Sequence, residues 1–196
     1  MSEGRVHILG LGGSLRIGSW NRTLLEEAAR LASSSGIAID LTKLDLVGTL
    51  PLFNQDLQTP GDIPPGVDEL KDALRAADGL LIATPEYNWG IPGFLKNAID
   101  WASRPNSDNP QVFGDLPVVV IGTGGASGTR NAQTAWISVF RYLKMRPWFG
   151  RYMFLDRARE RFDDAGHLTD EMMRNELEML VSEFAAHCVE QPRSRA

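Results

Sequence analysis

Residues 84–88 read Thr84-Pro85-Glu86-Tyr87-Asn88, a polar loop whose neighbours show what it connects. The apolar run at residues 79–83 comes before it, and residues 91–101 after it have the pattern of a helix. A second polar loop, residues 12–21, joins the first apolar run of the chain to the first helical segment. Polar loops that follow parallel strands are where an open α/β sheet holds a phosphorylated ligand. We therefore expect both loops at one edge of such a sheet.

The rest of the chain alternates short apolar runs with segments of helical spacing. Strands are expected at residues 6–11, 37–41, 79–83 and 116–122, with a last one inside 147–155. Helices are expected at residues 21–35, 67–77, 92–101 and 130–144, followed by a final helix that has Thr169 as its N-cap and ends before Pro192. Residues 44–66 contain four prolines and are predicted to form a long surface loop.

This alternation predicts an α/β fold. Strands that alternate with helices require a parallel sheet with helices on both faces. We expect a flavodoxin-like, doubly wound, five-stranded sheet in the order 2-1-3-4-5, whose switch point lies between strands 1 and 3. These two strands end in the two polar loops. With 196 residues and no repeat or linker, the chain is expected to form one domain, residues 1–196.

Composition excludes several classes of function. The net charge of -5 argues against nucleic-acid binding through phosphate contacts. A single cysteine, Cys188, excludes an internal disulfide and is expected to be an inert packed thiol. The histidines are scattered, so no metal site is predicted. No apolar run reaches the ~20 residues of a membrane span and no signal peptide is visible, so a cytoplasmic location is expected.

The loop at residues 12–21 carries groups that a phosphate needs. It offers the hydroxyls of Ser14 and Ser19, the guanidinium of Arg16 and the amide of Asn21. An arginine can bind two phosphate oxygens at once. The alternative is a Ser/Gly-rich turn in which Ser19 or Asn21 serves only as the N-cap of the next helix. The loop also half-matches a dinucleotide fingerprint, but Leu15 occupies the place of the third glycine.

Taken together, the two loops resemble those of the NAD(P)H-dependent FMN reductase family, which includes chromate and quinone reductases. Gly13-Ser14-Leu15-Arg16 with Ser19-Trp20-Asn21 resembles its phosphate loop. Residues 84–88 with 92–101 resemble its flavin loop and the following helix, and residues 162–171 give a further match. The resemblance covers nearly the whole chain in order.

The resemblance implies a role for eleven residues in cofactor binding. Ser14, Arg16, Ser19 and Asn21 would hold the FMN phosphate, and Trp20 would narrow the edge of the pocket. The isoalloxazine would be lined by Pro85, Glu86, Tyr87 and Asn88, largely through backbone N–H groups. Thr123 and Gly124 would touch the flavin ring from a third loop, whose later residues depart from the family pattern. For Trp89 the alternative is packing in the core or at an interface.

The function implied is that of an FMN-dependent oxidoreductase. Bound FMN would take a hydride from NAD(P)H as co-substrate and pass it to a quinone or similar acceptor, such as chromate, an azo compound or free flavin. The resemblance also implies a homodimer or homotetramer, with the helix at residues 92–101 in the interface. Two alternatives remain open: a non-enzymatic flavodoxin-type electron carrier, and a flavin-free dinucleotide-binding module.

Residues 141–161 form a basic stretch, with seven Lys or Arg against two acids. A solvated surface is the default interpretation. The alternatives are a contact with a partner subunit, or attraction of Arg157 and Arg159 for the 2′-phosphate of NADPH.

Overall fold

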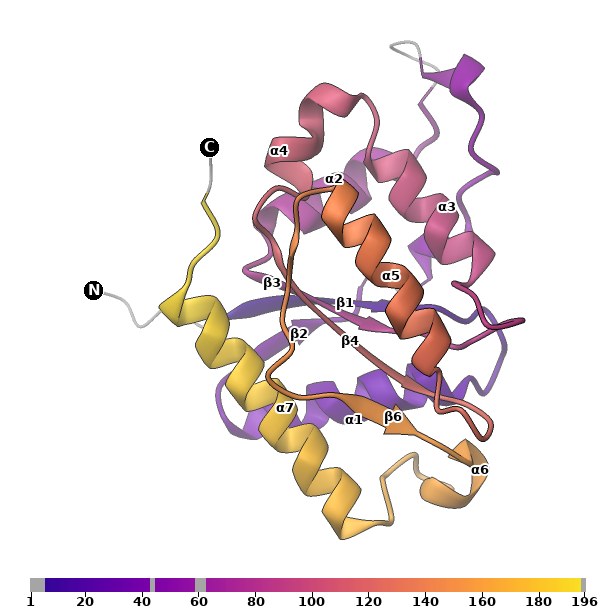
Figure 1. Cartoon of the computed structure of the whole chain (residues 1–196), viewed down its shortest axis with the longest axis vertical. Coiled ribbons are helices and arrows are strands. Elements are labelled where there is room, and N and C mark those ends of the chain that lie inside the picture. Colours follow the sequence, from indigo (N-terminus) through magenta and orange to yellow (C-terminus); the bar gives the residue numbers. More distant parts are fainter. Residues whose placement is uncertain (1–5, 43–44, 59–62, 195–196) are drawn as a thin grey trace.

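The computed structural model of this chain describes residues 6–42, 45–58 and 63–194. A parallel sheet forms its centre and helices cover both faces (Figure 1). The strands are β1 (His7–Gly12), β2 (Ala38–Asp40), β3 (Gly79–Ala83), β4 (Pro117–Thr123), β5 (Arg146–Pro147) and β6 (Met153–Leu155). They pair in the order β2-β1-β3-β4-β5, and all pairings are parallel. The predicted order 2-1-3-4-5 is confirmed.

The fifth position of the sheet differs from the prediction, because two short strands share it. β5 pairs with the start of β4 and β6 with its end, in the registers Pro117↔Arg146 and Ile121↔Met153. Between them the chain leaves the sheet. Trp148, the first residue after β5, still donates its N–H to Val118 O at 2.8 Å, and its ring packs 5.7 Å from that of Phe184.

The helices divide between two hydrophobic cores, one on each face of the sheet. They are α1 (Trp20–Ser34), α2 (Val67–Ala76), α3 (Gly93–Ala102), α4 (Asn109–Val112), α5 (Arg130–Tyr142), α6 (Ala158–Arg161) and α7 (Glu171–Glu190). In Figure 1, α2, α3 and α5 lie on one face of the sheet and α1 and α7 on the other. Along β1 and β3, successive side chains point to opposite faces: Leu9 and Ile82 enter the core with α2, α3 and α5, whereas Ile8 and Leu81 enter the core with α1 and α7.

Two local predictions were wrong. Asp170, not Thr169, is the N-cap of α7, because its carboxylate accepts from Met172 N at 3.0 Å and Met173 N at 3.2 Å. The segment 44–66 is not a surface loop throughout its described part. It contains 3₁₀ turns at Leu46–Gly48 and Gln55–Leu57, and Val47 is buried in the core. Residues 44 and 59–62 of that segment lie outside the described residues.

Two other features bear on the predicted partners and chemistry. The apolar side chains of α3, such as Leu95 and Trp101, are buried in the chain's own core. Cys188 is buried as expected, and burial raises the pKa of its thiol to about 12. None of the helices in the described part of the chain is long and apolar enough to cross a membrane.

Candidate functional site

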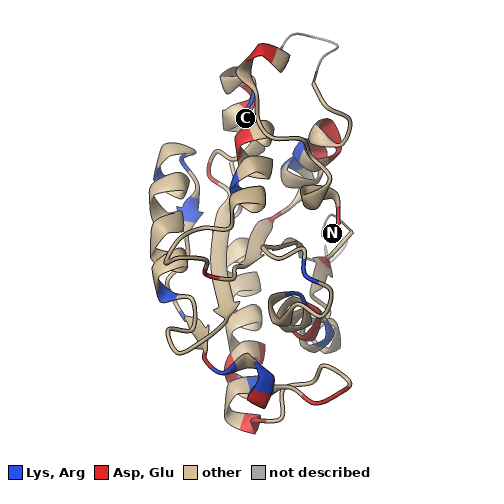
Figure 2. Cartoon of the chain, turned by 90° about the vertical axis from the view of Figure 1, so that its right-hand side faces the viewer, with Lys and Arg blue, Asp and Glu red and all other residues tan. Residues whose placement is uncertain are grey.

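A cavity of about 400 Å³ lies at the carboxyl ends of β1, β3 and β4. Every predicted site residue except Asn88 lines it: Ser14, Arg16, Ser19, Trp20, Asn21, Pro85, Glu86, Tyr87, Thr123 and Gly124. Four further residues also line it: Arg157 and Arg159, for which attraction of the NADPH 2′-phosphate was an alternative, and Ala158 and Glu160, which were not predicted. Figure 2 turns this edge of the sheet toward the viewer, with α6 and its charged residues at the lower end. The three loops predicted to form a site therefore meet, and a fourth segment joins them.

The loops after β1 and β3 are in direct contact. Gly13 N donates to Ala83 O at 2.8 Å. A Cβ added to Gly13 would lie 2.7 Å from Pro85 Cδ, closer than carbon atoms can approach. Glycine is required here by this close approach, which brings the two halves of the site together.

The first turn of α1 borders the cavity and makes it positive. Ser19 is the N-cap, and its Oγ accepts from Arg22 N at 3.3 Å, which confirms the capping role considered for it. The first N–H groups of a helix have no partner within the helix and carry part of its dipole. Arg16 is exposed, and its guanidinium has no ion pair among the described residues. A phosphate at this place would meet hydroxyl, backbone and guanidinium donors.

Asn21 has a positioning role that the sequence analysis did not anticipate. Its Nδ2 donates to Thr123 O at 2.8 Å, and its Oδ1 accepts from Thr123 N at 3.0 Å. The side chain is buried, and this pair of bonds joins the start of α1 to the end of β4. Its amide oxygen is therefore committed to the backbone of Thr123.

Thr123 lines the cavity and carries a buried hydroxyl. Its side chain is 2 % exposed, and its Oγ1 has no hydrogen-bond partner among the described residues. Buried polar atoms in native proteins are nearly always paired. An unpaired hydroxyl on a cavity wall fits a site that binds a polar ligand.

Glu86 lines the cavity but directs its carboxylate to the start of α5. The carboxylate accepts from Asn131 N at 2.8 Å, Ala132 N at 3.0 Å and Ser127 Oγ at 3.0 Å. Burial alone raises the pKa of Glu86, but these bonds and one from the Asn131 side chain outweigh it, so its pKa lies below the ordinary value of 4.5. The charged carboxylate holds the second loop against the third.

The loop after β3 ends in a tight hairpin. Tyr87 and Gly90 exchange two backbone hydrogen bonds, of 3.3 Å and 2.9 Å. Asn88 and Trp89 between them both have positive φ, 50° and 62°, as the central residues of a type I′ turn do. This turn places Asn88 outside the cavity lining. Trp89 is 79 % exposed, which excludes core packing.

The fourth wall of the cavity is formed by residues 157–160, the N-cap and most of α6, and we call it the α6 wall. It packs against α1. The rings of Trp20 and Phe162 stack with centroids 5.6 Å apart and an angle of 11°. Ala158 N donates to Gly124 O at 3.4 Å. Trp20 therefore both lines the cavity and supports the segment opposite. The sequence carried one signal of this wall: Arg157 and Arg159 directly follow the last parallel strand, whose carboxyl end lies at the site edge.

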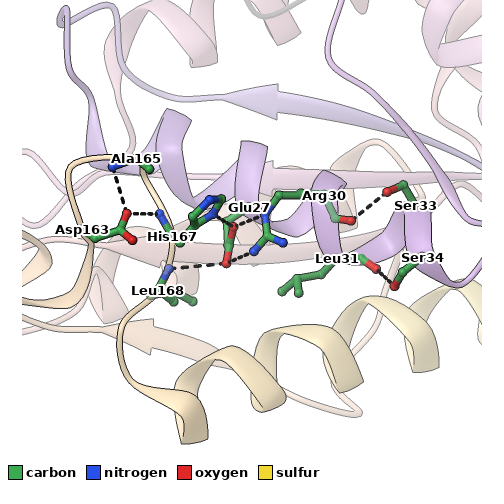
Figure 3. Close-up of polar contacts among 9 residues, drawn as sticks. All are labelled: Glu27, Arg30, Leu31, Ser33, Ser34, Asp163, Ala165, His167 and Leu168. Atoms are coloured by element: carbon green, nitrogen blue, oxygen red, sulfur yellow. Dashed lines mark hydrogen bonds and ion pairs between the residues drawn. The ribbon is translucent and has the colours of Figure 1, made fainter.

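A buried carboxylate fastens the turn after α6 to the middle of α1 (Figure 3). Glu27 accepts two bonds from Arg30, of 2.8 Å and 2.5 Å, and its Oε2 lies 3.2 Å from His167 Nδ1. Leu168 N donates to the same carboxylate at 3.4 Å. Asp163 stabilises this turn by accepting from Ala165 N and His167 N. The position of the α6 wall is thus tied to α1, the helix that follows the loop after β1.

Comparisons with known proteins find relatives over most of the chain. The model of the family of NADPH-dependent FMN reductases matches residues 6–160. An NAD(P)H-dependent FMN reductase of Pseudomonas aeruginosa is 40% identical over 170 residues, 86% of this chain and 88% of the relative. An NAD(P)H:quinone oxidoreductase of Solanum tuberosum is 36% identical over 174 residues, 88% of this chain and 87% of the relative.

A solved structure is similar over almost the whole length. The flavoenzyme NAD(P)H:(acceptor) oxidoreductase FerB from Paracoccus denitrificans superposes with a TM-score of 0.85 and 30% sequence identity, over 95% of this chain and 99% of that one. The match of the family model and the identity to these relatives show that the chain belongs to the NADPH-dependent FMN reductase family.

Proposed function

We propose that this protein is an FMN-dependent NAD(P)H oxidoreductase that reduces a quinone or a similar small acceptor. The observation that carries the proposal is the single cavity in which the loops after β1, β3 and β4 meet. The relatives named above are FMN and quinone reductases, and this chain has the two loops and the strand order that such a site needs.

The residues present fit FMN. Arg16, Ser14 and Ser19 would hold its phosphate together with the free N–H groups of the first turn of α1. The unpaired Thr123 hydroxyl would gain a partner at the polar edge of the cofactor. Because Gly13 has no side chain, it packs closely against Pro85 and does not fill the space that FMN would occupy.

Bound FMN would supply the redox chemistry, accepting a hydride from NAD(P)H and reducing the acceptor. The protein's part is to orient, to stabilise charge and to limit access. The N–H of Tyr87 donates to Gly90 O within the hairpin. Other backbone N–H groups of this loop would therefore donate to the negative charge that develops on the reduced flavin. Glu86 keeps those groups in place through its bonds to α5.

A homodimer or homotetramer is the assembly that the family resemblance implies, and it stays a prediction. The expected contribution of α3 has no support from exposed apolar side chains, because those of α3 are buried in the core. Exposed aromatic residues occur elsewhere, at Tyr142, Phe149 and Tyr152.

Steady-state assays test the proposed function. Purified protein loaded with FMN should oxidise NADPH in the presence of a simple benzoquinone, and removal of the flavin should abolish the activity until FMN is added back. A protein that takes up no FMN would contradict the proposal.

A further inference from the structure

The α6 wall of the cavity presents positive charge that the proposed FMN site does not use. Arg157 and Arg159 line the same cavity as Arg16, but from the segment that follows the last strand. Both residues are exposed, and the side chain of Arg157 is 64% exposed. Cationic groups therefore reach the cavity from two separate parts of the chain.

These two arginines are less neutralised than three other arginines of the basic stretch. Those three have close carboxylate partners: Arg146 with Asp115 at 3.0 Å, Arg151 with Glu176 at 3.0 Å and Glu183 at 2.7 Å, and Arg161 with Asp156 at 2.8 Å and Asp170 at 3.0 Å. The carboxylates nearest to Arg157 lie at 3.4 Å and 3.9 Å, and the nearer one, Asp156, is shared with Arg161. Arg159 has no ion pair among the described residues.

The support beneath the two arginines is firmly attached. Arg161 joins the two ends of the segment by binding Asp156 and Asp170. The stack of Trp20 on Phe162 and the bonds to the Glu27 carboxylate fasten it to α1 (Figure 3). A ligand bound here would spend little free energy on ordering this wall.

The two ligands of the proposed function, FMN and a nicotinamide dinucleotide, differ in the number of phosphate groups that they carry. FMN carries one phosphate, and Arg16 with the first turn of α1 already matches it. A nicotinamide dinucleotide carries a pyrophosphate and, in NADPH, a third phosphate. Guanidinium groups bind phosphate oxygens in pairs. We propose that Arg157 and Arg159 bind the phosphate groups of the nicotinamide dinucleotide, so that α6 is the docking element for the electron donor.

This inference rests on the proposed function of the same cavity. It also predicts the effect of a charge of opposite sign: Glu160 lines the cavity beside the two arginines, and its carboxylate would repel the same phosphates. Glu160→Gln should therefore change dinucleotide binding in the direction opposite to the loss of the arginines.

Calorimetric titration of the FMN-loaded protein with NADP⁺ and NAD⁺ tests the proposal without turnover. For the double variant R157Q/R159Q we expect the NADP⁺ dissociation constant to rise about tenfold or more, the scale of lost charge-assisted hydrogen bonds. For E160Q we expect it to fall. The matched control is Arg141→Gln, an exposed arginine of the same stretch in the last turn of α5, with no effect expected. The FMN dissociation constant is measured for each variant by quenching of flavin fluorescence.

The outcomes separate the sources of the phosphate. A loss for NADP⁺ alone supports contact with the 2′-phosphate, and an equal loss for NAD⁺ supports contact with the pyrophosphate. Unchanged NADP⁺ binding overturns the proposal. If FMN binding is weaker at the same time, the arginines are assigned to the FMN phosphate instead. If the wild-type protein takes up no FMN, the proposed function fails instead, and the same NADP⁺ titrations of the flavin-free variants still decide this inference.

Discussion

Arg16 and Thr123 contribute to the cavity in different ways. Arg16 is an exposed cation without an ion pair in the described part of the chain, whereas Thr123 is a buried hydroxyl without a hydrogen bond. Neither arrangement stabilises the empty protein, since a lone surface charge contributes little and an unpaired buried hydroxyl costs free energy. Both are explained by a ligand, and each gives a prediction at the scale of one residue.

Arg16→Ala should weaken FMN binding by about 1–3 kcal/mol while the thermal stability of the flavin-free protein stays the same. Titration of apoprotein with FMN and a thermal melt measure the two quantities. Arg22→Ala is the matched control, because Arg22 is an exposed arginine already paired with Glu26 and Asp45. Equal FMN affinity with lower stability would mean that the loop is structural.

Thr123→Val should have opposite effects on the empty and the loaded protein. Valine has the same shape and removes the unpaired hydroxyl, so the flavin-free protein should be as stable as the wild type or more stable. FMN binding should weaken by about 0.5–1.5 kcal/mol, the contribution of one hydrogen bond. Chemical denaturation without flavin and FMN titration give the two values. A loss of stability without a loss of affinity would show that the hydroxyl has a structural partner.

At the scale of elements, Glu86 is the link that joins two loops of the site. Its carboxylate reaches from the loop after β3 to the first turn of α5, where a negative charge is favourable. Since its folded-state pKa lies below 4.5, the ionised form is the one that the fold stabilises. The contribution of the ionised Glu86 to the free energy of unfolding is complete above pH 4.5 and is lost as the pH falls through the folded-state pKa.

Glu86→Gln should therefore destabilise the protein by about 0.3–1 kcal/mol at pH 7, and the effect should become smaller as the pH falls below 4.5 and the wild-type carboxylate becomes protonated. Denaturation at several pH values checks this convergence. The control is Glu190→Gln, an exposed glutamate at the end of α7. A difference from wild type that does not change with pH would contradict the electrostatic account.

An element or contact could be predicted where the sequence pattern that indicates it lies within one short stretch of the chain. The strand order and the meeting of three loops follow from apolar periodicity and from parallel connections, and both were predicted. The Asn21 and Glu86 links were missed because each joins residues far apart in the sequence, 102 positions in the case of Asn21 and Thr123. The split fifth strand was missed because its pieces are only two and three residues long. For Arg157 and Arg159 the sequence left NADPH binding only as an alternative, because their charges alone do not show that the segment after β6 reaches the cavity.

Across the whole molecule, the candidate site and the hydrogen bonds of Arg193 lie at opposite ends of the sheet. At the amino end, the buried Arg193 donates to Gly114 O at 3.0 Å, Leu74 O at 2.9 Å and Gln111 O at 2.5 Å. These bonds attach the segment after α7 to α2 and α4. The site at the carboxyl end shares none of these residues.

Arg193→Ala should consequently lower the free energy of unfolding by about 1–3 kcal/mol, because three carbonyl groups lose a charged donor. FMN affinity at a temperature where the variant is fully folded should equal that of the wild type. Urea denaturation and FMN titration measure the two effects. A parallel loss of FMN affinity would show that the two ends of the sheet are coupled.

In the function proposed above, this cavity holds a flavin which NADPH reduces directly. The most direct test is to load the purified protein with FMN, remove oxygen, add NADPH and follow the absorbance of the flavin. Rapid bleaching of the yellow colour is the predicted result. A bound flavin that stays oxidised would contradict the account and favour an electron carrier that a separate partner reduces.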